Sequence, residues 1–225
     1  GDQVDYRATI FRILDKLKVL DHNWKEGIYS TKVYKFMSIG KTSYIEPNYN
    51  VLIGTSEGFV LTLQRESPRY KFESLHKSTV TFIKAYKNEI ITTSHGKCIR
   101  RYVGSEHTKF NCVKESRCGE FIIGAKCTNN EVLVAYHGKV ALFEKDTLSI
   151  ISNYEAPERC LCVMKWAYND KHVACTTLNS NCILLWTRNL GDLERLHGHR
   201  MEVSCLEMVK ENLISGSHDG TIRYC

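Results

Sequence analysis

The sequence predicts an all-β protein assembled from repeated antiparallel sheets. Apolar runs of three to six residues recur along the chain, and each pair of runs flanks a short turn of Gly, Asn, Asp or Ser. Such runs are typical of strands joined by hairpins. Only 3 of the 225 residues are proline, so little interrupts strand pairing. We therefore expect short strands rather than helices over most of the chain.

Five copies of one unit follow each other. The tips of the central turns fall at positions 58, 96, 138, 181 and 220, which are 38 to 43 residues apart. A shift of 123 residues places Val203 on Val80 and Ile222 on Ile99, and this shift equals three units of about 41 residues. One unit is too thin to bury both of its faces. We expect neighbouring units to stack, and their inner strands to be apolar on both faces.

The turns of these units contain glycines at four equivalent places: Gly58, Gly96, Gly138 and Gly220. Tight hairpins need residues that tolerate positive φ, so we expect positive φ at these glycines. If the units stack around an axis, the turns gather on one face of the molecule.

The first thirty residues follow a different pattern. An apolar stripe with spacings of three and four predicts a short helix over residues 5–18, through Ile10, Ile13, Leu14 and Leu17. We expect residues 1–31 to form a helical linker and residues 32–225 to form the repeated domain. Residues 32–36 are a further strand candidate.

The last unit identifies the kind of repeat. It reads Leu196-His197-Gly198-His199, then an apolar stretch, then Ser215-Gly216-Ser217-His218-Asp219-Gly220-Thr221-Ile222-Arg223. This pattern resembles a blade of the WD-repeat β-propeller family. The resemblance implies four-stranded blades and a buried hydrogen-bond network through His199, Ser217 and Asp219. Ser, His and Asp also form hydrolase triads, but we interpret this set as structural.

The number of blades leaves two arrangements open. WD-repeat propellers usually have seven or eight blades, and this chain has five recognisable units. Either residues 32–36 close the ring by completing the last blade, or the chain is an incomplete propeller. The start at Gly1, without Met, favours the incomplete propeller.

A short motif near the N-terminus narrows the resemblance. Asn23-Trp24-x-x-Gly27 precedes the strand candidate at 32–36, and this order is similar to the linker of F-box/WD-repeat proteins. We expect Trp24 to pack the linker against the propeller and Gly27 to let the chain turn. The resemblance implies a substrate receptor of a Skp–cullin–F-box ubiquitin ligase. It would reach the Skp–cullin machinery only through an F-box, which this chain does not contain.

The turn face is the candidate binding site. His95, His137 and His218 occupy one place in three turns, and Glu57 takes it in the first. Lys77 and Arg200 are aligned in the loops that enter two units, whereas His76 and His197 are aligned as strand-end packing residues. We predict that a short peptide, phosphorylated or not, binds this rim at six residues: His218, Arg200, His95, Lys77, His137 and Glu57. Solvated turn residues are the alternative for each one.

Composition and motifs restrict the other functions. The net charge of +6 comes without a dense Lys/Arg run, so nucleic acid is not indicated, and an RNA-associated propeller ranks behind a generic WD-repeat scaffold. No apolar run reaches the roughly 20 residues of a membrane span. We find no phosphate loop, hydrolase elbow or metal-ligand spacing, and expect neither an enzyme, nor a metal, nor a cofactor. Ten cysteines without C-x-x-C favour an intracellular protein, cytoplasmic or nuclear.

Overall fold

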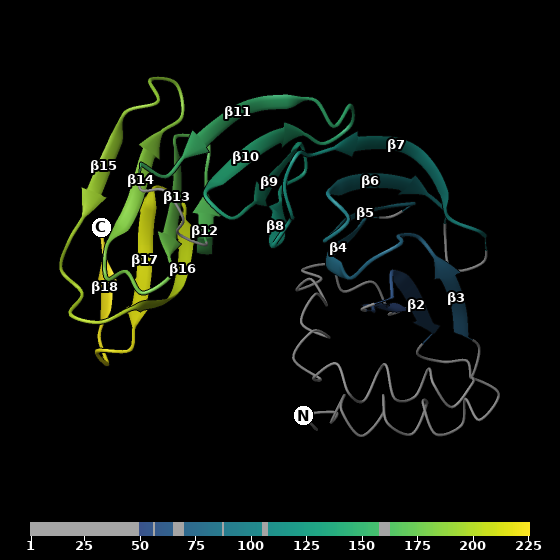
Figure 1. Cartoon of the computed structure of the whole chain (residues 1–225), viewed down its shortest axis with the longest axis horizontal. Helices are drawn as coiled ribbons and strands as arrows, with labels where there is room; N and C mark the ends of the chain where they lie inside the picture. Colours follow the sequence, from purple (N-terminus) through teal and green to yellow (C-terminus); the bar gives the residue numbers. More distant parts are fainter. Residues whose placement is uncertain (1–49, 56, 65–69, 87, 105–107, 158–162) are drawn as a thin grey trace.

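The described part of the chain consists of five antiparallel sheets (Figure 1). The computed structural model describes residues 50–55, 57–64, 70–86, 88–104, 108–157 and 163–225. The helix expected over 5–18, the strand at 32–36 and the linker motif Asn23, Trp24 and Gly27 lie outside these residues. In Figure 1 the five sheets follow one another along an arc. We number them blades 1 to 5 in chain order.

Consecutive strands pair within each blade, so every blade is a simple meander. Blade 1 contains β1 (Asn50–Gly54), β2 (Phe59–Gln64) and β3 (Tyr70–Ser74); blade 2, β4 (Val80–Tyr86), β5 (Glu89–Ser94), β6 (Cys98–Val103) and β7 (Asn111–Arg117); blade 3, β8 (Gly124–Cys127), β9 (Glu131–Ala135), β10 (Lys139–Glu144) and β11 (Ile150–Glu155); blade 4, β12 (Val163–Tyr168), β13 (His172–Thr177), β14 (Ile183–Thr187) and β15 (Leu193–Leu196); blade 5, β16 (Val203–Val209), β17 (Asn212–Ser217) and β18 (Ile222–Tyr224).

The repeat predicted from the sequence is confirmed. Each predicted turn joins two paired strands, as between β5 and β6 or between β17 and β18. Three blades have four strands, while blades 1 and 5 each show three among the described residues. By the repeat register, the described strands of blade 1 match the second to fourth strands of a blade, and those of blade 5 match the first three.

Stacking of the blades buries both faces of the inner strands, as predicted. In β9, Val132 and Val134 belong to the apolar core shared with blade 2, whereas Leu133 and Ala135 belong to the core shared with blade 4. All four side chains are fully buried. Alternate side chains of a strand point to opposite faces, so β9 is apolar throughout because it has a neighbouring blade on each side.

Backbone geometry corrects one expectation about the turns. Gly58 and Gly220 have positive φ values of 87° and 79°, but Gly96 and Gly138 do not. In blade 2 the left-handed position is one residue later, at Lys97, with φ of 63°. The turn of blade 4 uses Asn179, with φ of 58°. Asparagine takes this conformation more readily than most residues, whereas lysine is held in it by the surrounding hairpin.

Candidate recognition face

The hairpin turns and the loops that enter the blades form one continuous face, which we call the turn face. At three of the four seams, the carbonyl of a turn residue accepts a hydrogen bond from the first residue of the next blade. Thr55 accepts from Val80 at 3.0 Å, His137 from Val163 at 3.0 Å, and Ser180 from Val203 at 3.4 Å. At the seam between blades 2 and 3, the Tyr136 hydroxyl of blade 3 donates to the sulfur of Cys118, the residue that follows β7, at 3.0 Å. These bonds fix each blade against the start of the next, so the face is held in register across the seams.

In blade 5 a buried histidine ties the entry loop to the turn. His199 Nδ1 lies 3.1 Å from Asp219 Oδ2, and its Nε2 lies 2.9 Å from Ser215 Oγ. A carboxylate can only accept, so Nδ1 carries the proton and, in neutral His199, Nε2 accepts from the Ser215 hydroxyl. Hydrogen bonds from the Thr221 hydroxyl and the Arg200 backbone amide hold the pKa of Asp219 below its ordinary value. Asp219 therefore stays ionised and joins the entry loop of blade 5, at His199 and Arg200, to the turn, at Thr221.

The strand serine of this network is Ser215 and not the predicted Ser217. Ser217 lies two residues closer to the turn, where its hydroxyl donates to the Met201 carbonyl at 2.9 Å and accepts from the Asp219 amide at 3.1 Å. The imidazole spans from the turn to a deeper residue of β17. Because His199 Nδ1 donates to the Asp219 carboxylate in the turn, Nε2 on the other side of the ring reaches Ser215.

Blade 2 contains a second buried histidine at the equivalent place. His76 Nε2 lies 2.7 Å from Thr92 Oγ1, and its Nδ1 lies 3.4 Å from the sulfur of Cys98. Burial, with a contribution from Arg100, lowers the pKa of His76 to about 4. The expected alignment of His76 with His197 is wrong, because His76 matches His199 at the shift of 123 residues and makes the same bond to a strand hydroxyl. His197 is exposed.

The histidine, serine and aspartate of blade 5 are placed for structure. Ser215 is 2 % exposed and His199 is 5 % exposed. A nucleophilic serine has to reach its substrate, and the fold covers this hydroxyl. The network therefore satisfies buried polar groups and fixes the turn.

The structure places all six predicted rim residues on the turn face. Glu57, Lys77, His137, Arg200 and His218 are exposed, and His95 is half-buried. In blade 5 the site is tied together through the backbone: the Arg200 amide donates to Asp219 at 2.8 Å and the His218 amide donates to the Glu202 carbonyl at 3.0 Å. Lys77 directly follows buried His76, and Glu57 directly precedes Gly58, whose carbonyl accepts from the His76 amide at 2.9 Å.

Sequence reasoning missed a set of turn-face residues between blades 2 and 3: Lys97, Phe121 and Lys139. Lys97 Nζ lies 5.0 Å from the centroid of the Phe121 ring, and Lys139 Nζ lies 2.9 Å from Glu120 Oε1. Lys97 comes from a turn, Lys139 from the start of β10, and Phe121 from a loop outside the repeat pattern. No periodic signal marks them, because their proximity arises only when the blades stack.

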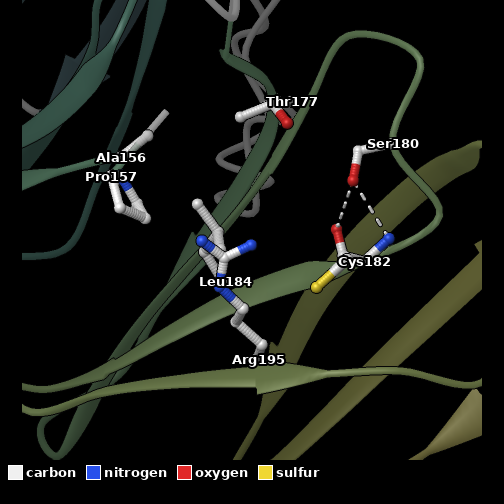
Figure 2. Close-up of a pocket in the computed structure, with 7 residues that line it drawn as sticks. All are labelled: Ala156, Pro157, Thr177, Ser180, Cys182, Leu184 and Arg195. Atoms are coloured by element: carbon white, nitrogen blue, oxygen red, sulfur yellow. Dashed lines mark hydrogen bonds between the residues drawn. The ribbon is translucent and has the colours of Figure 1, made fainter. Parts of the chain in front are cut away.

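A small pocket opens beside blade 4 (Figure 2). It is lined by seven residues: Ala156, Pro157, Thr177, Ser180, Cys182, Leu184 and Arg195. Its volume of about 30 Å³ is close to the space of one water molecule, whereas small-molecule sites have roughly 300–1,000 Å³. Ser180 Oγ accepts from the Cys182 amide at 3.1 Å within its wall. This pocket is too small for a metabolite.

The described residues contain neither a metal site nor a membrane-spanning helix. Among them, no three His, Cys, Asp or Glu side chains gather as metal ligands. In the part of the chain that the structure describes, no helix has the length and apolarity of a membrane span.

Comparisons with known proteins give the class of fold. No family model matches the chain, and no curated protein matches it. Among solved structures, the β-propeller domain of Cps50 (Swd1) from Myceliophteria thermophila matches with a TM-score of 0.65 and 15% identity over 78% of this chain and 66% of that chain. The computationally designed protein Ika8 matches with a TM-score of 0.65 and 17% identity over 81% of this chain.

Coverage of these structures is unequal. The chain spans 56% of the length of Ika8 and 92% of the designed protein Ika4, which matches with a TM-score of 0.55 and 20% identity over 67% of this chain. At such identities the likeness concerns the fold alone. Together with the five stacked sheets, it shows that the chain has a β-propeller fold.

Proposed function

We propose that this chain is a protein-recognition module that binds short peptide segments on its turn face. The observation that carries the proposal is the set of hydrogen bonds across the seams, which joins the turns of blades 1, 3 and 4 to the next blade and Tyr136 of blade 3 to Cys118. It gives a preorganised surface several blades wide, and preorganisation reduces the entropy lost on binding. The Ser–His–Asp set of blade 5 is buried, which suits a structural role in such a scaffold better than catalysis.

The rim residues support a ligand with anionic groups. Arg200, Lys77, His218 and His137 are exposed cationic or protonatable side chains on this face, and Glu57 is the acidic exception. The Arg200 backbone amide donates to the ionised Asp219, so the backbone that carries the Arg200 guanidinium is held in place. Guanidinium groups bind carboxylates and phosphates with two parallel hydrogen bonds. We infer that the ligand is a short acidic or phosphorylated peptide that crosses the rim at these residues and His95.

The finer proposal is a biological role. We propose that the propeller is the substrate-recognition part of an F-box/WD-repeat ubiquitin-ligase receptor, acting inside the cell. The support is the similarity of Asn23-Trp24-x-x-Gly27 to the linker of that family, and of Glu211-Asn212-Leu213-Ile214-Ser215-Gly216-Ser217 to its repeats. A propeller scaffold in another multiprotein complex is the competing role, and it shares the same binding face.

The binding site is tested with a double variant, Arg200→Ala with His218→Ala. A library of immobilised serine and threonine peptides, each with and without phosphate, provides the probe. We expect the variant to lose roughly tenfold in affinity for the peptides that bind best. Lys171→Ala is the matched control, because Lys171 is an exposed cation at the opposite end of the blades. It lies in the turn between β12 and β13 and is paired with Glu211 in the turn between β16 and β17. Equal binding by wild type and double variant would mean that the rim assignment is wrong.

The ligase role is tested separately. The full-length protein is purified from cells and tested for a co-purifying Skp-family adaptor and cullin. Their presence supports the receptor, and their repeated absence assigns the propeller to a different assembly. Peptide binding on the turn face is compatible with either result, so the two proposals fail independently.

A further inference from the structure

Phe121 is an apolar side chain that the fold leaves on the turn face. It lies in the loop between β7 and β8 and is 56% exposed, whereas the next residue, Ile122, is fully buried in the core between blades 2 and 3. The loops entering blades 2 and 5 are fastened by buried His76 and His199. This loop is fastened instead by Cys118, so Phe121 is not needed to anchor it.

The loop around Phe121 is rigidly held. The Cys118 amide donates to the Lys97 carbonyl at 2.7 Å, and the Tyr136 hydroxyl donates to the Cys118 sulfur at 3.0 Å. Tyr136 is itself buried. The exposed ring therefore projects from a fixed loop. When a partner covers the ring, the loop loses little conformational entropy, because it is already ordered.

Two lysines from different blades flank this loop. Lys97 Nζ lies 5.0 Å from the Phe121 ring centroid and donates to the Gly119 carbonyl at 3.1 Å. Lys139 Nζ is 2.9 Å from Glu120 Oε1 and 5.5 Å from the Tyr136 ring centroid. We call Lys97, Glu120, Phe121 and Lys139 the Phe121 corner. It combines an exposed aromatic ring with two ammonium groups against one carboxylate.

The charges of the corner favour a peptide over a nucleic acid. An ammonium has three N–H donors, so both lysines retain capacity for an anionic ligand beyond the contacts described. The sugar–phosphate backbone of a nucleic acid offers no N–H group to the Glu120 carboxylate. A peptide backbone instead offers N–H groups that a carboxylate accepts. Aromatic stacking of single-stranded nucleic acid also relies on successive rings along a basic groove, whereas this corner exposes one.

We infer that the Phe121 corner anchors an extended acidic segment of a partner protein. An aliphatic or aromatic side chain of the segment packs on the Phe121 ring, and neighbouring carboxylates bind Lys97 and Lys139. This inference rests on the proposed function, because it takes the turn face as the peptide-binding face. It adds the chemistry of the ligand and places its apolar anchor at the seam between blades 2 and 3, away from Arg200 and His218 of blade 5.

The test uses fluorescein-labelled peptides of equal length and measures anisotropy with the full chain. The first peptide alternates Glu with Leu, the second replaces Leu by Ser, and the third replaces Glu by Lys. A single-stranded oligouridine is the fourth probe. We expect the Glu–Leu peptide to bind best and the Phe121→Ser variant to bind it roughly tenfold more weakly, as when an interface aromatic is truncated. Lys97→Ser should weaken binding several-fold and reduce its dependence on salt.

The control variant is Leu190→Ser, which truncates a more exposed apolar side chain (74%) between β14 and β15. It should bind as the wild type does. Because Phe121 and Leu190 are both exposed, both variants should keep the wild-type circular dichroism spectrum.

Four outcomes overturn the inference. They are equal binding of the Glu–Leu and Glu–Ser peptides, no effect of Phe121→Ser, tighter binding of oligouridine than of any peptide, and no binding of any probe. If Phe121→Ser has no effect while the Arg200 and His218 double variant loses peptide binding, the proposed function stands and only the anchor is wrong. If both sets of variants bind as wild type, the turn face is not the binding face.

Discussion

Blades 2 and 5 contain the same buried histidine in two different settings. His76 and His199 each bond a hydroxyl of the second strand of their blade, Thr92 and Ser215. The other ring nitrogen of His199 meets the Asp219 carboxylate, whereas that of His76 lies near the Cys98 sulfur. The bond from histidine to strand is thus common to both blades, and the turn carboxylate is specific to blade 5.

This difference has a chemical consequence. A carboxylate is a strong acceptor and a thiol is a weak hydrogen-bonding group. In blade 5 the imidazole connects loop, turn and strand, because Asp219 also binds the Arg200 amide and Thr221. In blade 2 the same ring fills a buried space and satisfies a hydroxyl, but it has no carboxylate to bind its other nitrogen. In blade 5 the carboxylate therefore fixes the turn, whereas in blade 2 the buried imidazole of His76 resists protonation.

The largest expected effect separates the two histidines by stability. His199→Ala leaves the Ser215 hydroxyl without its partner and removes one of the hydrogen bonds to the Asp219 carboxylate, and we expect it to lower the free energy of unfolding by about 3 kcal/mol. His76→Ala leaves Thr92 as the main orphan and should cost about 2 kcal/mol. Urea unfolding of both variants measures the difference. A greater loss in His76→Ala would mean that Asp219 adds nothing to its blade.

The next effect is a pH dependence that belongs to blade 2. Burial keeps native His76 neutral down to a pKa of about 4, from an ordinary value of 6.5. The unfolded chain therefore binds a proton at this residue at a higher pH than the folded chain does. Stability is fully present above pH 6.5 and falls as the pH is lowered from 6.5 towards 4, by about 2 kcal/mol between pH 7 and pH 5.

Unfolding of wild type and His76→Gln at pH 7 and pH 5 checks this dependence. The variant has no ionisable group at this position, so its loss between the two pH values should be smaller by the same amount. An identical loss in both proteins would assign the acid sensitivity to other groups.

The smallest effect is local to the turn of blade 5. Asp219→Ala removes the acceptor of the Arg200 and Thr221 amides, so hydrogen exchange at these two amides should become faster. Exchange at the His95 amide, which donates to the Thr79 carbonyl of blade 2 at 2.9 Å, is the internal control and should not change. Unchanged exchange at Arg200 would show that the turn is held without its carboxylate.

Much of the site was predictable where the chemistry is local. His199 and Asp219 stand in a recognisable motif, and the regular turns correctly placed the rim residues on one face. The choice of Ser215 over Ser217 was not predictable from the motif, since it depends on how deep the imidazole reaches into β17. The equivalence of His76 with His199 was available in the 123-residue shift, and only the structure, with its matching hydrogen bond, showed that His197 does not fit.

The sequence alone determined the period, the strand runs and the turn positions, because strand propensity and turn chemistry act over a few neighbouring residues. Only the tertiary structure decided which residues meet across a seam. Lys97, Phe121 and Lys139 lie in three separate segments, and stacking of blades 2 and 3 brings them together. The repeat predicted that neighbouring units stack and that β9 is apolar on both faces, but the pairs of side chains that meet at each seam depend on how the backbones are placed in space, which no local pattern encodes.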